Sequence, residues 1–220
     1  MIQDNILLRY QKLHQRIAGE AIRDVLDEIV RQSLAARMPL IPVQVACLLF
    51  TLARIASPGR IVELGTGFGY SALLLALASV ESHIVTIENN AKCGKVAQSF
   101  FGKTRVGDRI SLLFGDAISV LPTISGSFDF VFLDAAKEEY SSYLQLLLPR
   151  LSKGALLVAD DVFFAGEMPD GHLPEPVKEK IIHELEHFRC FLRQKPYFLT
   201  SFLPIDCGMS VTLLTKHPEL

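Results

Sequence analysis

Residues 60–71 read RIVELGTGFGYS and contain the strongest indication of the fold class. Its first part, RIVEL, has the apolar character of a buried strand. Gly65, Gly67 and Gly69 then stand at alternate positions, where glycine lets the chain turn tightly and lets another group approach the backbone. The turn opens a helix that we predict over residues 70–80. A strand that passes through a glycine turn into a helix predicts the first unit of an α/β sheet, and ligands bind at this end of the strands in such sheets.

The same alternation of strand and helix continues along the chain and predicts a mostly parallel sheet with helices on both faces. Further strands are predicted at 83–88, 109–114, 128–134 and 155–160, and helices at 90–102 and 137–151, with a short helix after Asp116. Residues 4–36 and 43–56 have helical apolar spacing. The C-terminal part reads as a loop rich in Gly and Pro at 162–176, a helix at 177–193, and an antiparallel pair of strands at 197–203 and 209–215.

The bulk composition indicates one globular domain, residues 1–220, with N-terminal helices over 1–57 and an α/β core over 58–220. The net charge of -2 excludes the strongly basic surface of a general nucleic-acid binder. No apolar run reaches the ~20 residues that span a bilayer, and the charged N-terminus is unlike a signal peptide. The four cysteines form no close pair, which favours a reducing cytoplasm over a disulfide framework.

Glu88, at the end of the second predicted strand, is a candidate for binding a ribose, because a carboxylate there can accept both ribose hydroxyls. The alternative is a solvated charge at a strand end. A dinucleotide fingerprint would place a third glycine at position 70, which is Tyr70 here, so a nicotinamide-dependent oxidoreductase is the weaker alternative.

Three aspartates follow two apolar strands. Asp134 ends FDFVFLD, and Asp160 and Asp161 end ALLVADD. If the two strands are neighbours, their carboxylates lie at the same end of the sheet, where a hard divalent cation such as Mg²⁺, Mn²⁺ or Ca²⁺ would balance their charge. No His or Cys joins this cluster, which argues against zinc. Alternatively, Asp134 could cap the helix that follows it, and Asp160 and Asp161 could be solvated charges in a loop.

The motifs VELGTGFGYS, IVTIE, FGDA and FLDAAKEEY, in that order, resemble those of the class I S-adenosylmethionine-dependent methyltransferases. More narrowly they are similar to the metal-dependent O-methyltransferases that include catechol and caffeoyl-CoA O-methyltransferases, with a bacterial branch. The resemblance covers residues 36–215. It implies a Rossmann-like fold whose mostly parallel, seven-stranded sheet has an antiparallel C-terminal strand.

The resemblance also implies roles for individual residues. Glu63 and the glycine turn would hold the methionine end of the cofactor, Ser71 its carboxylate and Glu88 its ribose. Asp134 would act in catalysis and lie at the cofactor as well as the metal, and Lys137 would be the general base. The expected cofactor-binding residues are Ile41, Glu63, Gly65, Gly67, Ser71, Glu88, Asp116, Ala117 and Asp134, and the expected metal ligands are Asp134, Asp160 and Asp161. Asp161 stands where the family usually has asparagine.

Lys137 has a structural alternative as an exposed lysine paired with Glu138 or with an aspartate of the cluster. Phe163 and Phe164 could line a substrate pocket or pack in the core. The HELEH stretch at 183–187 fits the pattern of zinc proteases, but Ile181, Leu185 and Phe188 form the apolar stripe of that helix, so we expect its histidines to face solvent.

The expected substrate is a small molecule with adjacent hydroxyls, as in catechols. The resemblance includes a bacterial branch that methylates hydroxyuridine in tRNA, but acidic residues nearly cancel the basic ones in the N-terminal helices, so tRNA is the weaker alternative. A non-catalytic binding protein on the same fold is a third class. The family is often dimeric, and the apolar helices before residue 57 could form the interface of a homodimer.

Overall fold

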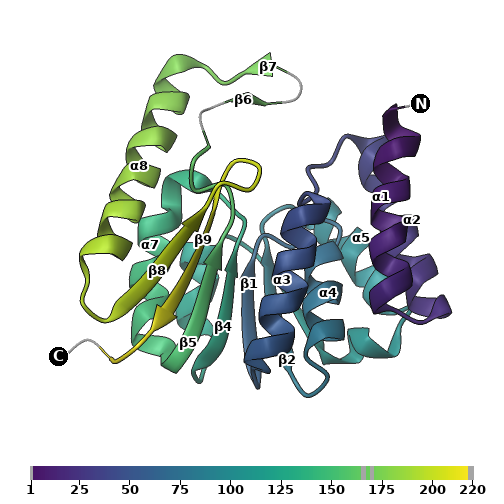
Figure 1. Ribbon diagram of the computed structural model, residues 1–220, viewed down its shortest axis with the longest axis horizontal. Coiled ribbons are helices and arrows are strands. Elements are labelled where there is room, and N and C mark those ends of the chain that lie inside the picture. The colour runs from purple at the N-terminus through teal and green to yellow at the C-terminus, as the bar shows by residue number, and fades with distance from the viewer. Residues whose placement is uncertain (1, 165–166, 169–170, 218–220) are drawn as a thin grey trace. The chain divides into compact units, whose positions relative to one another are not determined.

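The computed structural model describes residues 2–164, 167–168 and 171–217. The chain forms two compact units, Met1–Asp116 and Ala117–Leu220, and Figure 1 labels most of their helices and strands. The boundary follows the third strand. The first unit holds the N-terminal helices together with the first three strands and the helices that connect them, and the N-terminal helices pack on one another and on the helix after the first strand. The single domain expected from composition stays a prediction.

The first unit contains three parallel strands in the order β3-β2-β1. They are β1 (Arg60–Leu64), β2 (His83–Glu88) and β3 (Ile110–Phe114), and they match the predicted ranges to within a residue. Leu64 pairs with Ile87 and Glu88 with Phe114, so the carboxyl ends of all three strands lie at one edge. The crossover connections carry α4 (Tyr70–Ala78), α5 (Ala91–Phe101) and the 3₁₀ helix η1 (Arg105–Arg109).

The N-terminal part of this unit is helical, as expected, but the helical spacing over 4–36 belongs to two helices. They are α1 (Ile2–Ile17) and α2 (Glu20–Ala36), and they pack side by side (Figure 1). The division falls at Gly19, which has extended backbone at the start of α2 and, as glycine, favours a helix less than most residues. The helix predicted over residues 43–56 is present as α3 (Val43–Ala56), which packs on α4.

The second unit contains four strands in the order β4-β5-β9-β8. They are β4 (Phe128–Leu133), β5 (Leu151–Ala159), β8 (Phe198–Leu203) and β9 (Met209–Leu214). β4 and β5 are parallel neighbours, and β9 is antiparallel to both β5 and β8. The two units together therefore contribute the seven main strands that were expected, with the last strand antiparallel to its neighbours.

The helices of the second unit are α6 (Ala117–Val120), α7 (Tyr140–Leu147) and α8 (Glu175–Gln194), with 3₁₀ helices η2 (Leu121–Thr123), η3 (Lys137–Glu139) and η4 (Leu148–Arg150). The predicted helix over 137–151 is thus three shorter pieces. Pro149 accounts for the end of α7, because it cannot continue the hydrogen bonding of that helix. The predicted loop over 162–176 contains one antiparallel pair, β6 (Glu167–Met168) with β7 (Gly171–His172).

Within the part of the chain that the structure describes, no helix combines the length and the apolar character needed to cross a membrane.

Candidate active site

The glycine turn after β1 has the backbone that its sequence predicts. Gly65, Gly67 and Gly69 all have positive φ, at 95°, 54° and 89°, a region that residues with a Cβ atom rarely adopt. At Gly69 a Cβ atom would also lie 2.6 Å from the Phe101 ring. The Gly65 N–H donates to the Ile87 carbonyl at 3.0 Å, which ties the turn to the end of β2.

Glu88 extends from the end of β2 toward this turn. One of its carboxylate oxygens accepts the backbone N–H of Gly67 at 2.8 Å, and the other accepts the N–H of Asn90 at 2.7 Å. Asn90 in turn caps α5 through its side chain, at 2.9 Å from the Lys92 N–H. The carboxylate is therefore fixed in orientation while it keeps further lone pairs for a ligand. Asn90 was missed by the sequence analysis, although a residue that can cap a helix directly after a strand was its visible signal.

Glu63 is buried on β1 with none of its surface exposed. Thr86, its partner across the β1–β2 pair, donates its hydroxyl to Glu63 Oε2 at 2.5 Å. Because the Thr86 hydrogen is used there, the 2.6 Å contact between the hydroxyls of Thr66 and Thr86 has Thr66 as its donor. A relay of two threonines thus holds the carboxylate next to the glycine turn. Sequence reasoning found Glu63 but not the threonines, which have no distinctive spacing.

The other residues expected to bind the cofactor occupy defined positions. Ser71 lies in the first turn of α4, where backbone N–H groups at the helix start favour an anion, and it is 6% exposed. Gly115, just before Asp116, donates its N–H to the Glu88 carbonyl at 3.0 Å, so the end of β3 joins the same edge. Ile41 and Ala117 are both buried.

The ends of β4 and β5 bring two of the three aspartates to one edge of the sheet, as predicted. Leu133 pairs with Ala159, and the residues that follow these two are Asp134 and Asp160. The Asp160 N–H donates to the Leu133 carbonyl at 2.9 Å. The buried Tyr140 hydroxyl lies 3.3 Å from the Leu133 carbonyl and 3.1 Å from that of Asp160, so it fixes both strand ends; sequence reasoning did not single it out.

Lys137, the first residue of η3, contacts two aspartates of this cluster. Its Nζ lies 2.7 Å from the carboxylate of Asp161 and 3.8 Å from that of Asp134. Burial acts to lower the pKa of Lys137, but the neighbouring carboxylates of Asp134 and Asp161 outweigh it, and the pKa is raised above its ordinary value. Lys137 is therefore an ammonium ion paired with carboxylates. The alternative considered for it was an exposed lysine; the pairing with an aspartate is present, but the side chain is only 18% exposed.

The cluster carries more negative than positive charge. Burial and the neighbouring carboxylates of Asp134 and Asp161 raise the pKa of Asp160 to about 8. The pKa of Asp134 is also raised, by burial first and by Asp161, against the opposing effect of Lys137. A pKa this high means that the protein alone does little to stabilise the negative charge of the Asp160 carboxylate. An additional cation would stabilise this charged form.

Among the described residues, one group of three side chains has ligand atoms within 4.8 Å of one another, and it consists of Asp161, Asp206 and Cys207. It shares Asp161 with the predicted set but does not include Asp134 or Asp160. Burial and the carboxylate of Asp161 raise the pKa of the Cys207 thiol to about 11, which disfavours the thiolate that binds metals. The all-oxygen set of Asp134, Asp160 and Asp161 remains the better chemical match to a hard cation.

Asp161 has φ 56°, in the left-handed region. Asparagine and aspartate are the residues other than glycine that adopt this conformation most readily, so a position of this kind accepts either. The replacement of the family's usual asparagine is therefore compatible with the backbone.

The two phenylalanines after the aspartates have different surroundings. Phe164 is buried, with the Lys137 Nζ 5.9 Å from its ring centroid. Phe163 is 41% exposed and packs against Phe202 and the guanidinium of Arg189. Its ring fills the space above Gly208, where a Cβ atom would lie 2.2 Å away.

The HELEH stretch lies on α8 as expected of a surface helix. Its apolar stripe of Ile181, Leu185 and Phe188 is buried, whereas His183 and His187 are exposed. His187 Nδ1 contacts the Ser141 hydroxyl at 2.9 Å, and Glu184 accepts the Ser141 N–H at 2.8 Å. These residues tie α8 to the start of α7, and no third ligand joins the histidines among the described residues.

Comparison with known proteins identifies the family. The O-methyltransferase family profile matches residues 16–216. A catechol O-methyltransferase of Mycobacterium tuberculosis is 36% identical over 136 residues, which are 60% of this chain and 62% of that protein. The chain therefore spans somewhat less than two thirds of that relative.

Two solved structures agree over more of the chain. The O-methyltransferase of Bacillus cereus, in complex with S-adenosylhomocysteine, has a TM-score of 0.74 and 25% identity, covering 87% of this chain and 90% of its own. The O-methyltransferase TomG of Streptomyces achromogenes, in complex with S-adenosylmethionine, has a TM-score of 0.77 and 25% identity, covering 91% of this chain and 92% of its own.

These matches define the class as Rossmann-like, S-adenosylmethionine-dependent O-methyltransferases. The chain belongs to the O-methyltransferase family. The fold and the family expected from the motifs are confirmed, and the nicotinamide-dependent alternative is not supported.

Proposed function

We propose that this chain transfers the methyl group of S-adenosylmethionine to a hydroxyl of a small catechol-like or phenolic molecule, with the help of a divalent cation. The observation that carries the proposal is the pairing of Lys137 with Asp134 and Asp161, next to the buried Asp160, in a chain that belongs to the O-methyltransferase family. The cluster combines an excess of carboxylates with a single amine, which suits a reaction that must hold a cation and move a proton.

The cofactor residues have distinct tasks in this proposal. The carboxylate of Glu88, oriented by the N–H groups of Gly67 and Asn90, accepts the ribose hydroxyls. Glu63 and the backbone at Gly65 hold the methionine end, and Ser71 binds its carboxylate at the start of α4. Asp116 and Ala117 border the adenine, while Ile41 contacts the cofactor from the segment before α3.

The proposed metal is Mg²⁺ or another hard divalent cation, held by Asp134, Asp160 and Asp161. The fit rests on the donor set, which is all carboxylate, and on the raised pKa of Asp160, which marks charge that the protein leaves uncompensated. When bound, such an ion lowers the pKa of a coordinated hydroxyl and orients it.

Lys137 is the proposed general base, with Asp134 beside it. As an ammonium ion it cannot accept a proton, and the carboxylates that keep it protonated are the proposed metal ligands. A cation that balances the charge of these carboxylates would remove the cause of the raised pKa of Lys137. Lys137 would then be able to accept a proton, so its role as a base depends on a cation at the carboxylates.

The proposed substrate class is supported by the chemistry of the site and by the charge of the chain. Two adjacent hydroxyls offer a chelating pair of oxygens to a hard cation, and the M. tuberculosis relative carries the name catechol O-methyltransferase. The net charge of -2 does not favour tRNA. The cytoplasmic location and the homodimer stay predictions.

A direct test incubates the enzyme with S-adenosylmethionine carrying a labelled methyl group and one of three acceptors: catechols, matched monophenols, or tRNA containing hydroxyuridine. We expect transfer to catechols that stops with EDTA and returns with Mg²⁺, and much slower transfer to monophenols. Efficient, salt-sensitive transfer to tRNA with none to any phenol would replace the proposed substrate class. Full activity in chelator would remove the metal from the proposal.

A further inference from the structure

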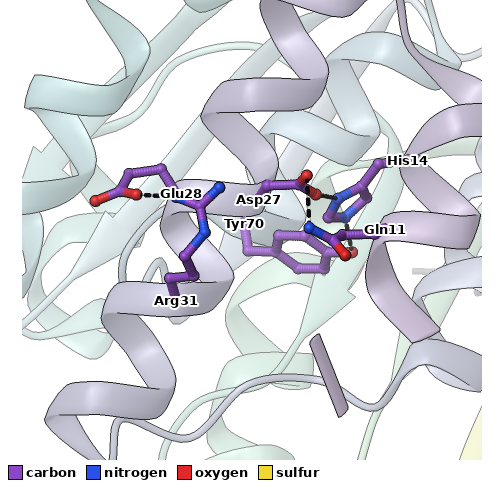
Figure 2. A network of polar contacts seen from close by, with 6 residues as sticks. All are labelled: Gln11, His14, Asp27, Glu28, Arg31 and Tyr70. Atoms are coloured by element: carbon purple, nitrogen blue, oxygen red, sulfur yellow. Dashed lines mark hydrogen bonds and ion pairs between the residues drawn. The ribbon is translucent and has the colours of Figure 1, made fainter. Parts of the chain in front are cut away.

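A buried chain of hydrogen bonds links the N-terminal helices to the glycine turn (Figure 2). His14 of α1 has none of its surface exposed, and its Nδ1 lies 2.5 Å from a carboxylate oxygen of Asp27 on α2. Its Nε2 lies 2.9 Å from the hydroxyl of Tyr70, which is 3% exposed. Gln11 donates to the second oxygen of Asp27 at 3.3 Å. The sequence separates His14 from Tyr70 by 56 residues, and neither belongs to the site described above.

The donors in this chain can be assigned from chemistry. An ionised carboxylate only accepts, so the Asp27 contact places the proton of a neutral imidazole on Nδ1. Nε2 is then an acceptor, and the Tyr70 hydroxyl donates to it. Burial lowers the pKa of His14 against the opposing effect of Asp27, which agrees with a neutral ring. Every polar atom of the imidazole is thereby satisfied, and the phenol of Tyr70 is held in one orientation.

Tyr70 occupies a critical position in the chain. It is the first residue of α4, directly between Gly69, the last glycine of the turn, and Ser71. The three glycines give the backbone of this turn conformational freedom, and that freedom must be removed when a ligand binds. A buried side chain fixed at the end of the turn restrains it before the ligand arrives.

Two further contacts, one from α1 and one from the segment just past α2, reach segments proposed to hold the cofactor. The Tyr10 hydroxyl of α1 donates to the Ile41 carbonyl at 2.7 Å, and its ring packs edge-on against that of Tyr70 at 5.7 Å between centroids. Met38, just past α2, packs on the turn, since a Cβ atom at Gly67 would lie 3.5 Å from its Cε. The N-terminal helices and Met38 therefore contact three residues of these segments: Ile41, Gly67 and Tyr70.

We propose that Tyr10, His14 and Asp27 are positioning residues, which act through Ile41 and Tyr70 to hold the glycine turn in the conformation that binds S-adenosylmethionine. The inference rests on the proposed function, because it takes the turn as the cofactor site. Apparent affinity falls in proportion to the fraction of protein in the binding-competent conformation, so loosening the turn weakens binding without touching the ligand.

The test uses Tyr70→Phe and Tyr10→Phe, each of which removes one hydroxyl and keeps the ring. For each variant, the Kd for S-adenosylmethionine is measured by calorimetry well below the melting temperature, with kcat and the KM for the cofactor measured alongside. We expect Kd and KM to rise about three- to tenfold, the range for one lost hydrogen bond, with kcat within twofold of wild type. A lower melting temperature with unchanged Kd and KM would show that the chain of hydrogen bonds only supports the fold and would overturn the proposal.

His14 provides a rescue experiment. His14→Leu removes both hydrogen bonds, whereas His14→Gln can place an amide oxygen near the position of Nε2 and accept from Tyr70 again. We expect the cofactor Kd of His14→Gln to lie between those of wild type and His14→Leu. Equal, wild-type affinity in both variants would contradict a positioning role.

A matched control is available on the same helix. Glu28 follows Asp27 directly and pairs with Arg31 on the exposed face of α2, away from Tyr70 (Figure 2). Glu28→Gln should leave the cofactor Kd unchanged. Glu88→Ala separates the two proposals: if it weakens binding while Tyr70→Phe does not, the positioning role alone is wrong. If the wild-type protein binds no S-adenosylmethionine, the proposed function fails, and the positioning role fails with it.

Discussion

The replacement of Glu88 by alanine is the most informative perturbation of the proposed cofactor site. Glu88 accepts two backbone N–H groups, at 2.8 Å from Gly67 and 2.7 Å from Asn90, which leaves its remaining lone pairs for the ribose hydroxyls. Hydrogen bonds to a charged group contribute about 1.5–3 kcal/mol. At 1.36 kcal/mol for each factor of ten, their loss should raise the Kd for S-adenosylmethionine by about 10- to 150-fold.

The same substitution also releases two backbone donors. Both lie in partly exposed segments, where water can replace the lost carboxylate, so we expect a moderate fall in stability of about 1–3 kcal/mol for two hydrogen bonds. Affinity is therefore measured by calorimetry well below the melting temperature. Glu88→Gln keeps one acceptor oxygen without the charge and should fall between alanine and wild type.

The matched control is Glu81→Ala. Glu81 is an exposed glutamate in the turn before β2, at the opposite end of the strand that Glu88 ends. It should bind the cofactor like wild type. A Kd of the Glu88→Ala protein within twofold of wild type, in a folded sample, would remove Glu88 from the cofactor site and refute the reasoning.

Three further predictions concern the second unit and the buried histidine. Activity should vanish with EDTA and return with Mg²⁺, and Asp134→Ala should be nearly inactive while calorimetry still detects cofactor binding; undiminished turnover in either case would contradict the metal site. Lys137→Ala should lower kcat by about 10²–10⁴ with unchanged cofactor affinity, whereas Asp161→Asn, which suits the same positive φ, should be tolerated; a rate for Lys137→Ala within a few-fold of wild type would leave Lys137 as an ion-pair partner only. Because burial lowers the pKa of His14 below its usual 6.5, the unfolded chain takes up this proton at a higher pH than the folded one, so the stability contributed by neutral His14 is present above pH 6.5 and is lost as pH falls below it. The melting temperature of wild type should therefore drop more steeply below pH 6.5 than that of His14→Gln, and parallel curves would contradict a titrating His14.

Local sequence patterns were enough to predict the strands and the turn that hold the residues of the proposed site. Apolar runs that end in Glu88, Asp134 and Asp160 predicted strand ends, and the glycines at 65, 67 and 69 predicted a turn with positive φ. These signals are local, because strand burial, helix periodicity and the backbone freedom of glycine are each written within a few residues. The order of the motifs then predicted the family, which the match over residues 16–216 confirmed.

Local signals were weaker where elements begin and end. Pro149 divided a predicted helix, and Gly19 divided the long N-terminal pattern. In both places the apolar residues continue across the break, so their spacing alone does not show where one element ends and the next begins.

The pKa values of Lys137 and Asp160, and the hydrogen bonds that orient Tyr70, depend on contacts that the local sequence does not predict. The pKa of Lys137 is raised by Asp134, three positions earlier, and by Asp161, which is 24 positions later in the sequence and 2.7 Å away. The pKa of Asp160 is raised to about 8 because burial and two other carboxylates act on it together. His14, Asp27 and Tyr70 carry no motif that joins them. Electrostatic and hydrogen-bond energies depend on distance in space and on exclusion of water, and the packing of the helices and strands sets both quantities for residues far apart in the chain.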